Sequence, residues 1–418
     1  MDGTVNVSHL SCLRCGRPRQ PDEGHLTCPD CGAGGLLEVQ YDYTTIARTF
    51  DRDALARNPD RTMWRYEPFL PVPPGSPRPH LAIGGTPMYR ADRLGLEIGL
   101  PHLWIKDDGL NPTGSLKDRA SAIAVAKALE TGQDTVACAS TGNAASSLAG
   151  NAANAGLKSV IFVSTRAPAG KIAQLLVFGA TVISVEGTYV DAFALSERAI
   201  ADYGWYNRNA AINPYLVEGK KTVALEIAEQ FGWNVPDWVV VSVGDGCTIA
   251  GVYKGFYDLL QVGWIDRLPR LLGVQAEGCA PICRAFVTGG PVEPSAEDTL
   301  ADSIAVGYPR NPDKALRAVK STNGAMITVA DADILDAMRL LGRTMGIFGE
   351  PAGVAGMAGL RRAVTQGLVQ KGERVTVVVT GNGLKDTASA ARATAPPIRV
   401  SPDPERLHEV LAAANVIR

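Results

Sequence analysis

Short apolar runs recur along most of the chain, and Ala-rich stretches of helical character separate them. Uninterrupted runs of this kind, rich in Val and Ile, are typical of strands buried on both faces. Strands that alternate with helices form parallel sheets. We therefore predict an α/β fold built on doubly wound parallel sheets. Its strands are expected at 135–139, 159–163, 181–185, 239–243, 271–274 and 375–379.

So many strands favour two α/β domains with a ligand cleft between them, because ligands of such sheets collect at the carboxyl ends of the strands. We predict a two-lobed core over 84–390, in which a smaller lobe, roughly 120–220, is inserted into the larger one. Residues 41–83 are rich in Pro and Arg, show little periodicity and predict a wrapping arm instead of a domain core. Residues 391–418 are expected to form a C-terminal tail helix.

Composition narrows the class of protein. A chain of 418 residues, 46% hydrophobic and 20% charged, is long enough for two packed domains and an appendage. Its net charge of -2 offers no basic surface for nucleic acid. No apolar run reaches the roughly 18 residues of a membrane span, and no secretory signal is recognisable. These features predict a cytoplasmic protein without nucleic-acid or membrane partners.

Four of the eight cysteines form two pairs near the N-terminus, and both pairs have the C-x-x-C spacing. Four thiolates at this spacing can surround Zn²⁺ as a tetrahedron, so residues 1–40 predict a zinc ribbon with a structural Zn²⁺. Chance spacing or a redox pair is the alternative. The predicted ligands are Cys12, Cys15, Cys28 and Cys31. The remaining cysteines lack ligand spacing and are expected to be core thiols: Cys138, Cys247, Cys279 and Cys283.

A loop over 111–119 carries the first candidate for catalysis, Lys117. Asn-Pro and Thr-Gly predict a turn, and Ser115 is a plausible N-cap for a helix over 120–129. A lysine in a first helical turn faces the positive end of the helix dipole, which lowers its pKa, as an amine nucleophile requires. The local alternative is a solvated surface lysine. Asp118 and Arg119 can pair with each other or anchor the turn.

Two more loops follow predicted strands and open helices, and both suit anions. Ser140, Thr141, Gly142 and Asn143 combine small residues with free helix N–H groups, which suits a carboxylate. The second loop is rich in glycine and predicts a phosphate cradle made of backbone N–H groups. It lacks the Walker lysine, so a nucleotide is disfavoured. Its residues are Gly244, Asp245, Gly246, Cys247 and Thr248.

A fourth loop, 380–386, follows the predicted strand 375–379. The Thr380 hydroxyl can hydrogen-bond a neutral ring nitrogen without protonating it. Together the four loops offer an amine, a phosphate seat, a carboxylate seat and a ring partner. None of the five histidines lies in them, so a lysine-centred mechanism is the one that the composition permits.

In this order, the loops resemble those of the fold type II, or tryptophan synthase β-like, family of pyridoxal-phosphate-dependent enzymes. The threonine synthases are the most similar branch. Asn-Pro-Thr-Gly-Ser-Leu-Lys-Asp-Arg resembles the cofactor-lysine motif, with Leu116 where Phe is more usual. Ser-Thr-Gly-Asn at 140–143 and Thr-Gly-Asn-Gly-Leu-Lys-Asp at 380–386 resemble two further motifs. The likeness extends from about residue 10 to 390 and includes the ribbon, 63–66 and 85–87.

The resemblance implies a role for each loop. Lys117 would bind pyridoxal 5'-phosphate as a Schiff base and shuttle protons, and Asn143 would meet the 3′-oxygen of the cofactor. Residues 244–248 would hold the cofactor phosphate, Thr380 would face the pyridine nitrogen, and 140–142 would hold the substrate carboxylate. The implied enzyme is a lyase that converts O-phosphohomoserine and water to threonine and phosphate. A homodimer is also implied by the family alone.

Two positions depart from the pattern of the threonine synthases. Ala144 stands where a hydroxyl is usual, and Leu216 and Val217 stand where a basic residue usually precedes Glu-Gly-x-Lys-Thr. Both positions are expected to contact the leaving phosphate, and charge-assisted contacts of this kind are strong. Four nearby side chains can compensate, although the sequence does not give their directions: Arg208, Asn209, Lys220 and Lys221.

These departures keep an alternative substrate open. A β-replacement or β-elimination on O-phosphoserine, as in cysteate synthase, fits the same cofactor loops and the ribbon. Deamination of serine or threonine fits less well, since dehydratases usually lack the ribbon. A non-catalytic binding protein with the same fold is disfavoured because Lys117, Asn143, Thr380 and the glycine loop are all intact.

Overall fold

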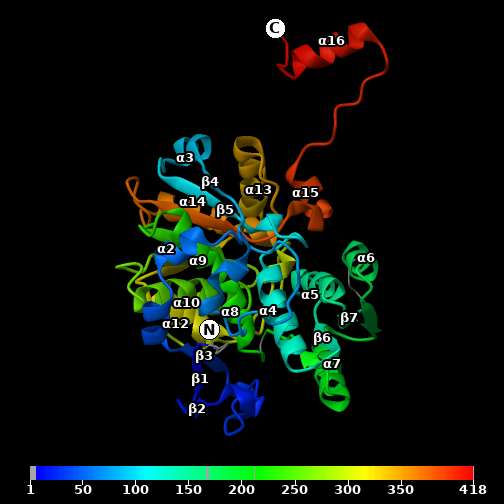
Figure 1. Ribbon diagram of the computed structural model, residues 1–418. Helices are drawn as coiled ribbons and strands as arrows, with labels where there is room; N and C mark the ends of the chain where they lie inside the picture. The colour runs from blue at the N-terminus through cyan, green and yellow to red at the C-terminus, as the bar shows by residue number, and fades with distance from the viewer. Residues whose placement is uncertain (1–5, 166–168, 211, 418) are drawn as a thin grey trace.

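The computed structural model describes residues 6–165, 169–210 and 212–417, which form three sheets with helices packed around them (Figure 1). The first sheet is small and antiparallel, with the order β2-β1-β3. Its strands are β1 (Val7–Cys12), β2 (Pro18–Arg19) and β3 (Leu37–Tyr41). It lies at the opposite end of the molecule from the C-terminal tail.

The largest sheet has six strands in the order β12-β11-β10-β13-β5-β4. All its neighbours pair in parallel except β4 and β5, which are antiparallel. In this order, the strands are β12 (Ala325–Val329), β11 (Arg270–Ala276), β10 (Trp238–Ser242), β13 (Val375–Val379), β5 (Leu103–Asp107) and β4 (Met88–Arg90). The third sheet is parallel throughout, with the order β8 (Thr181–Val185), β7 (Lys158–Ser164), β6 (Thr135–Ala139) and β9 (Tyr206–Asn207).

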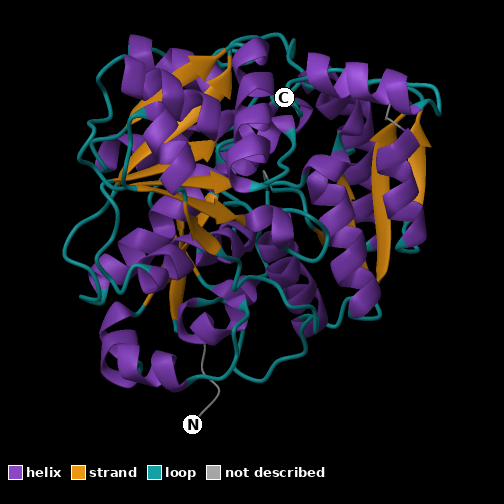
Figure 2. Ribbon diagram, turned by 90° about the horizontal axis from the view of Figure 1, so that it is seen from above, coloured by secondary structure: helices purple, strands orange, loops and turns teal. Residues whose placement is uncertain are grey.

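Helices cover both faces of the two parallel sheets (Figure 2). Around the large sheet lie α3 (Asp92–Ile98), α9 (Thr222–Gln230), α10 (Cys247–Gln261), α11 (Pro281–Thr288), α12 (Pro312–Ser321), α13 (Asp331–Met345), α14 (Pro351–Thr365) and α15 (Thr387–Ala393). Near the four-stranded sheet lie α4 (Lys117–Glu130), α5 (Asn143–Asn154), α6 (Ala169–Val177), α7 (Tyr189–Tyr203) and α8 (Tyr215–Lys220). The segment after β3 forms α1 (Tyr43–Thr49) and α2 (Arg52–Arg57), and α16 (Pro404–Ala413) lies in the tail.

The central strand β10 shows why its sequence is apolar without alternation. Val239 and Val241 enter the core beneath α10 and α12, whereas Trp238 and Val240 enter the core beneath α13 and α14. Successive side chains of a strand point to opposite faces, so a strand covered on both sides needs apolar residues at every position. The prediction of doubly wound parallel sheets is therefore confirmed.

Most predicted strands lie where the apolar runs placed them. The runs 135–139, 181–185 and 375–379 coincide with β6, β8 and β13, and the other three match to within two residues at either end. The pattern missed β4, β5, β9 and β12 of the six-stranded and four-stranded sheets and the three strands of the small sheet. In β5 the run is broken by Lys106 and Asp107, which are buried as ion-pair and hydrogen-bonding groups instead of facing water.

The segment 41–83 contributes more than a wrapping arm. Met63, Tyr66 and Phe69 are at most 1% exposed and belong to the same core as the inner face of the large sheet. This segment therefore contributes side chains to the core of the large sheet, and its description as an arm stays a prediction. The few apolar residues of this segment show neither helical nor strand periodicity, because a short 3₁₀ helix, Met63–Phe69, directs them toward the core.

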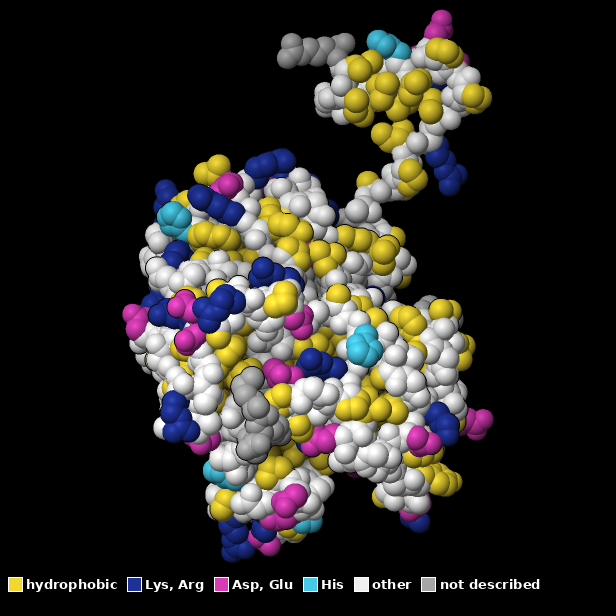
Figure 3. Space-filling view, in the orientation of Figure 1, with side chains coloured by type: hydrophobic (Ala, Val, Ile, Leu, Met, Phe, Trp, Pro, Cys, Tyr) yellow, Lys and Arg dark blue, Asp and Glu magenta, His cyan; other side chains and the backbone are white. Residues whose placement is uncertain are grey.

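The C-terminal tail projects from the body of the molecule (Figure 1), and α16 contains no buried residue. Exposed apolar side chains gather along this tail (Figure 3), among them Ile398, Leu407 and Val416. Among the helices that the structure describes, none is long and apolar enough to cross a membrane.

A buried ion network centred on Arg119 joins four segments of the chain. The guanidinium donates to Asp108 at 2.7 and 2.9 Å and to Glu226 at 2.5 and 2.8 Å. Lys106 donates to Glu226 at 2.7 Å, and the Thr86 hydroxyl donates to Asp108 at 2.6 Å. All five residues are at most 4% exposed. The network therefore connects the first turn of α4 with β5, α9 and the segment before β4.

We expect Arg119→Met to lower the free energy of unfolding by about 3–5 kcal/mol, because Asp108 and Glu226 would keep buried charges without their partner. Urea unfolding followed by circular dichroism measures this change. The matched control is Arg198→Met, which removes an exposed pair with Asp202 and should leave the urea midpoint in place. A stable Arg119→Met protein would contradict the role given to the network.

Candidate active site

The four predicted loops meet at the junction of the two parallel sheets. The strands β10, β13 and β5 are neighbours, so the segments that follow them leave the same edge of the large sheet. Residues 140–143 follow β6 of the four-stranded sheet. Asn143 reaches across to Glu350 at the start of α14, and its Nδ2 donates to Glu350 Oε1 at 2.5 Å. Segments far apart in the sequence thus form one site.

Lys117 is the first residue of α4, in the first helical turn as predicted. The residue before the helix is Leu116, in helical conformation, so the prediction of Ser115 as N-cap is wrong. The Ser115 hydroxyl instead accepts the Lys117 N–H at 3.3 Å. Leu116 is fully buried in the main core, which fixes the backbone on which Lys117 stands.

Asp118 and Arg119 anchor the turn separately and do not pair with each other. Asp118 accepts from the Thr113 N–H at 2.8 Å, from the Thr113 hydroxyl at 2.7 Å and from Asn151 Nδ2 at 3.1 Å. Arg119 points the other way, into the ion network of Asp108 and Glu226. Lys117 therefore lies between two residues whose side chains are fixed.

The lysine loop is also bound to the fourth loop. The Leu116 N–H donates to the Thr380 carbonyl at 2.9 Å, and the Asn382 N–H donates to the Gly114 carbonyl at 3.0 Å. Gly114 has a φ of 83°, which favours glycine in this turn. The Thr380 hydroxyl has no hydrogen-bond partner among the residues that the structure describes, and the residue is partly exposed. A hydroxyl without a protein partner can serve a ligand.

The surroundings of Lys117 lower the pKa of its ammonium to about 8. Burial is the largest cause, and the positive charges of Lys220 and Arg208 follow. Glu350 and Cys247 act in the opposite direction. The direction agrees with the prediction, but the causes named here are desolvation and neighbouring cations, where the sequence suggested the helix dipole.

Glu350 was missed in the sequence. It is 3% exposed and immediately precedes Pro351, the first residue of α14. A carboxylate followed by Pro ahead of an Ala-rich stretch is a helix-start signal, so its position was predictable although its contact with Asn143 was not. The Gly381 backbone leaves room for it, since a Cβ there would lie 2.0 Å from Glu350 Oε1.

The glycine loop runs into the start of α10 with little free space. A Cβ on Gly244 would lie 2.9 Å from Ile304 Cα, and one on Gly246, whose φ is 96°, would lie 2.5 Å from the Asn311 carbonyl. The Asp245 carboxylate is turned toward the protein, where it accepts from the Arg310 N–H at 2.7 Å. This loop thus presents backbone N–H groups, not the Asp245 side chain.

Cys247 and Thr248 begin α10, where N–H groups are free of helical partners. The Cys247 thiol donates to Asp245 Oδ2 at 3.1 Å, and burial raises its pKa to about 12, so it stays protonated. Ser140 is partly exposed, and its hydroxyl accepts the Gly142 N–H at 3.2 Å. Thr141 is partly exposed as well.

The loop 140–143, predicted to hold the substrate carboxylate, has a neighbour that the sequence did not indicate. A Cβ placed on Gly142 would lie 3.5 Å from Ser303 Oγ. Ser303 belongs to the long connection between α11 and α12, which also contacts Gly244 through Ile304. One connection therefore borders both the carboxylate loop and the glycine loop.

The four side chains proposed to compensate for Ala144 and Leu216 have different surroundings. Lys221 is neutralised by Glu218 and Asp258, at 2.5 and 2.6 Å. Asn209 Oδ1 accepts the Ala139 N–H at 3.0 Å. Arg208 and Lys220 have no carboxylate partner among the described residues, although both are buried.

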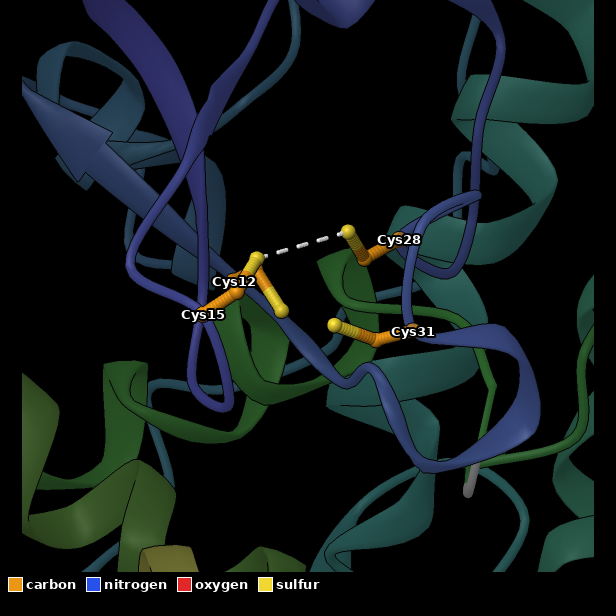
Figure 4. A group of neighbouring side chains, drawn as sticks. All are labelled: Cys12, Cys15, Cys28 and Cys31. Atoms are coloured by element: carbon orange, nitrogen blue, oxygen red, sulfur yellow. Dashed lines mark hydrogen bonds between the residues drawn. The ribbon is translucent and has the colours of Figure 1, made fainter.

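The four N-terminal cysteines lie together as predicted (Figure 4). Their sulfur atoms are all within 4.8 Å of one another, and Cys15 Sγ and Cys28 Sγ are 3.8 Å apart. A tetrahedron with bonds of about 2.3 Å places its sulfurs roughly 3.8 Å apart. A Cβ on Gly35 would lie 2.7 Å from Cys31 Cβ, so this position favours glycine. The other four cysteines are buried thiols, which confirms that prediction.

Comparison with known proteins places this geometry in a family. A family model described as pyridoxal-phosphate-dependent enzyme matches residues 80–381. Curated threonine synthases from Methanocaldococcus jannaschii and Methanosarcina acetivorans are each 40% identical over 403 and 408 residues, which cover 96% of this chain and 98% of each relative. The threonine synthase of Mycobacterium tuberculosis is 38% identical over 350 residues, 84% of this chain and 95% of the relative.

Solved structures support the fold. Threonine deaminase isoform 2 from Solanum lycopersicum has a TM-score of 0.63 at 22% identity, covering 74% of this chain and 87% of its own. Maize serine racemase has a TM-score of 0.63 at 21% identity, covering 79% of this chain and 93% of its own. At this identity the likeness concerns the fold alone.

The depressed pKa of Lys117 predicts how its amine reacts with an aldehyde. Only the neutral amine adds to a carbonyl, so the rate at which the cofactor-free protein attaches pyridoxal phosphate should rise with pH and level off above about pH 8. With an ordinary lysine, the rate would continue to rise until the pH approached the lysine pKa of 10.5. Stopped-flow absorbance over a range of pH measures the midpoint.

A matched pair of variants tests the cause of the shift. Lys220→Gln removes a neighbouring cation and should move the midpoint upward, whereas Lys158→Gln, an exposed lysine of β7, should leave it unchanged. A midpoint close to 10 in the unmodified protein would show that Lys117 is not perturbed.

Proposed function

The chain belongs to the family of pyridoxal-phosphate-dependent enzymes, and from this premise we propose that it is a threonine synthase, a lyase that converts O-phosphohomoserine and water to threonine and phosphate. The observation that carries this proposal is the extent of the likeness to curated threonine synthases, which covers 96% of this chain and 98% of the relatives. The arrangement of the four loops around Lys117 supports the same chemistry.

The side chains present fit the cofactor. Lys117 offers an amine with a lowered pKa, and the start of α10 offers free N–H groups beside Gly244 and Gly246, where a Cβ would collide with backbone. Such N–H groups suit a phosphate dianion. The unpartnered Thr380 hydroxyl suits an uncharged ring nitrogen. Pyridoxal phosphate, when bound, supplies the electron sink that stabilises a carbanion on the substrate.

Lys117 would hold the cofactor covalently and, once released by the substrate, move protons. A group transfers protons best when its pKa is close to the working pH, and a pKa of about 8 leaves both forms of the Nζ amine populated near neutrality. The buried contacts of Asp118 and Arg119 keep its backbone in place, so the amine swings from a fixed point.

The other loops would orient the reactants. Asn143 donates one amide hydrogen to Glu350, which leaves its second hydrogen for the 3′-oxygen of the cofactor. Ser140, Thr141 and Gly142 precede the free N–H groups of α5 and would hold the substrate carboxylate. For the phosphate of the cofactor we propose the backbone of residues 244–248, since Asp245 turns its carboxylate away.

A second candidate reaction is β-replacement or β-elimination on O-phosphoserine, as in cysteate synthase. The observation that favours it is the apolar character of two positions proposed to contact the leaving phosphate. Leu216 is fully buried in the core of the four-stranded sheet, and Ala144 has no polar atom beyond its backbone. At these two positions the chain therefore lacks the polar contacts to the substrate's leaving phosphate that are expected of a threonine synthase.

Turnover distinguishes the two reactions. With purified enzyme loaded with pyridoxal phosphate, we expect phosphate release from O-phosphohomoserine together with threonine identified by mass. The Lys117→Ala protein should lose this activity and the absorption band of the bound cofactor, because the amine that binds and protonates is gone. Release of phosphate from O-phosphoserine alone would reject threonine synthase in favour of the second candidate.

We also propose that the four N-terminal cysteines bind a structural Zn²⁺. Their sulfur distances suit a tetrahedral site, and four thiolates leave no open position for catalysis. The site is continuous with the body of the enzyme, since Tyr41 at the end of β3 donates to Glu218 at 2.8 Å. Loss of the metal is therefore expected to disturb the packing of α8 as well.

Metal analysis of the purified protein should give one Zn²⁺ per chain. Cys28→Ser should lower the zinc content and the thermal midpoint, because a structural zinc site contributes directly to folding. Cys283→Ser, a buried thiol outside the cluster, is the matched control and should retain zinc. Full zinc content in Cys28→Ser would rule out the proposed ligand set.

The remaining proposals concern organisation. We propose that residues 1–40 form the ribbon, 41–83 an arm, 84–390 a two-lobed core with a smaller lobe near 120–220, and 391–418 a tail. Free thiols at all eight cysteines are consistent with a reducing cytoplasm.

Homodimerisation is proposed from the family resemblance, and analytical ultracentrifugation tests it.

A further inference from the structure

Two buried cations near Lys117 lack the partners that buried charges normally have. Arg208 is 1% exposed and Lys220 is 2% exposed. Buried cations are costly unless a carboxylate or a carbonyl compensates them. Elsewhere in the described part of the chain, such compensation is present: Lys106, Arg119, Lys221 and Lys254 contact carboxylates, and Lys314 donates to the Leu37 carbonyl.

Among the residues that the structure describes, the guanidinium of Arg208 donates hydrogen bonds to a single hydroxyl group. Its Nε and Nη2 donate to Ser121 Oγ at 3.2 and 3.1 Å. Ser121 follows Lys117 by four residues in α4, so the two side chains lie on the same face of the helix, one turn apart. The guanidinium therefore contacts α4 one helical turn after Lys117.

Lys220 approaches the same place from another helix. It is the last residue of α8, and its side chain interacts with the Cys247 thiol in the first turn of α10. A Cβ on Gly251 would lie 2.8 Å from Lys220 Cβ, which shows how closely α8 packs on α10. Lys220 also follows Leu216 by four residues and shares its face of α8.

The nearest carboxylates are already bound to other groups. Asp245 accepts from the Arg310 N–H, Asn311 Nδ2 and the Cys247 thiol. Asp118 accepts from Thr113 and Asn151, and Glu350 accepts from Asn143. Within the ranges that the structure describes, none of the three forms an ion pair with Arg208 or Lys220.

The residue that follows Arg208 carries a buried amide nitrogen that lacks an acceptor. Asn209 is 4% exposed, and its Nδ2 has no hydrogen-bond partner, whereas its Oδ1 accepts the Ala139 N–H at 3.0 Å. A buried amide without an acceptor costs free energy, as does a buried cation without an anion. These buried donors lack a negatively charged partner in the described structure, and a bound anion would supply one.

We propose that Arg208 and Lys220 form a phosphate subsite beside Lys117, which binds the phosphate group of the substrate. The inference rests on the proposed function, which supplies a phosphorylated amino acid. Two cations match a phosphate dianion in charge, and Arg also matches it in hydrogen-bonding geometry. The subsite replaces the polar groups that Ala144 and Leu216 do not provide. The cofactor phosphate is the other possible source of the same chemistry.

The first experiment measures phosphate binding to the enzyme loaded with pyridoxal phosphate. Inorganic phosphate is titrated at constant ionic strength, followed by the absorption of the bound cofactor and by the thermal midpoint. We expect Arg208→Gln and Lys220→Gln to raise the dissociation constant of phosphate at least about tenfold, since charge-assisted hydrogen bonds are lost. Lys220→Arg keeps the charge and should retain binding.

Stability without phosphate provides a control for folding. Lys221→Gln, at the neighbouring position of α8, should lower the thermal midpoint because it leaves Glu218 and Asp258 unpaired. Lys220→Gln removes a cation without a carboxylate partner and should maintain or raise the midpoint. A fall in the midpoint of Lys220→Gln as large as that of Lys221→Gln would overturn the proposal and make Lys220 a structural residue.

The affinity for the cofactor separates the two sources of phosphate. If both variants bind pyridoxal phosphate as tightly as the unmodified protein and lose inorganic phosphate, the subsite serves the substrate. If the dissociation constant of the cofactor rises about tenfold while inorganic phosphate still binds, the same residues serve the cofactor phosphate. If neither constant changes, the two residues bind no phosphate and the proposal is wrong.

These measurements do not depend on turnover. An enzyme that binds phosphate through Arg208 and Lys220 but makes no threonine would reject the proposed function and leave the subsite in place. Conversely, threonine formation by Arg208→Gln and Lys220→Gln at the rate and KM of the unmodified enzyme would reject the subsite and leave the function in place.

Discussion

The position of Lys117 depends on the buried ion pairs of the residue two places after it. Arg119 is fully buried and binds Asp108 and Glu226, which joins α4 to β5 and α9. A buried charge that loses its partner is strongly destabilising, so this network tolerates only one placement of the first turn of α4. The loop before α4 is then joined to the segment that follows β13, because the Leu116 N–H donates to the Thr380 carbonyl and the Gly114 carbonyl accepts from the Asn382 N–H.

The buried charged side chains of this protein fall into two groups. Some form ion pairs that stabilise the fold, and others are cations without a carboxylate partner in the described structure. Lys221, Lys254 and Lys106 contact buried carboxylates. Lys221 also lies over the ring of Tyr41 at the end of β3, and Lys254 donates to the Tyr43 hydroxyl at the start of α1. Lys117, Arg208 and Lys220 have no such partners in the described structure. Burial is the largest cause that lowers the pKa of Lys117, and the charges of Lys220 and Arg208 lower this pKa further. The lowered pKa of Lys117 and the proposed phosphate subsite therefore depend on the same two buried cations.

The sequence alone determined the fold class and six of the ten strands in the six-stranded and four-stranded sheets, because a strand buried on both faces must be apolar throughout. It also determined the cluster of four cysteines and the positions of the four loops, since C-x-x-C pairs and Gly-rich turns are local patterns with local physical causes. The same reasoning missed β5, in which Lys106 and Asp107 interrupt the run, and excluded 41–83 from the core. In both cases distant partners outweighed the local pattern.

Only the tertiary structure decided which polar groups face one another. Lys220 and Lys221 are adjacent and identical in type, yet Lys221 meets Glu218 and Asp258 while Lys220 meets a thiol. Asn143 and Glu350 are 207 positions apart, and their contact exists only because the fold brings the start of α5 to the start of α14. Local propensity and spacing describe a residue and its near neighbours in the chain, whereas burial, pairing and pKa are set by atoms that the fold brings together from elsewhere.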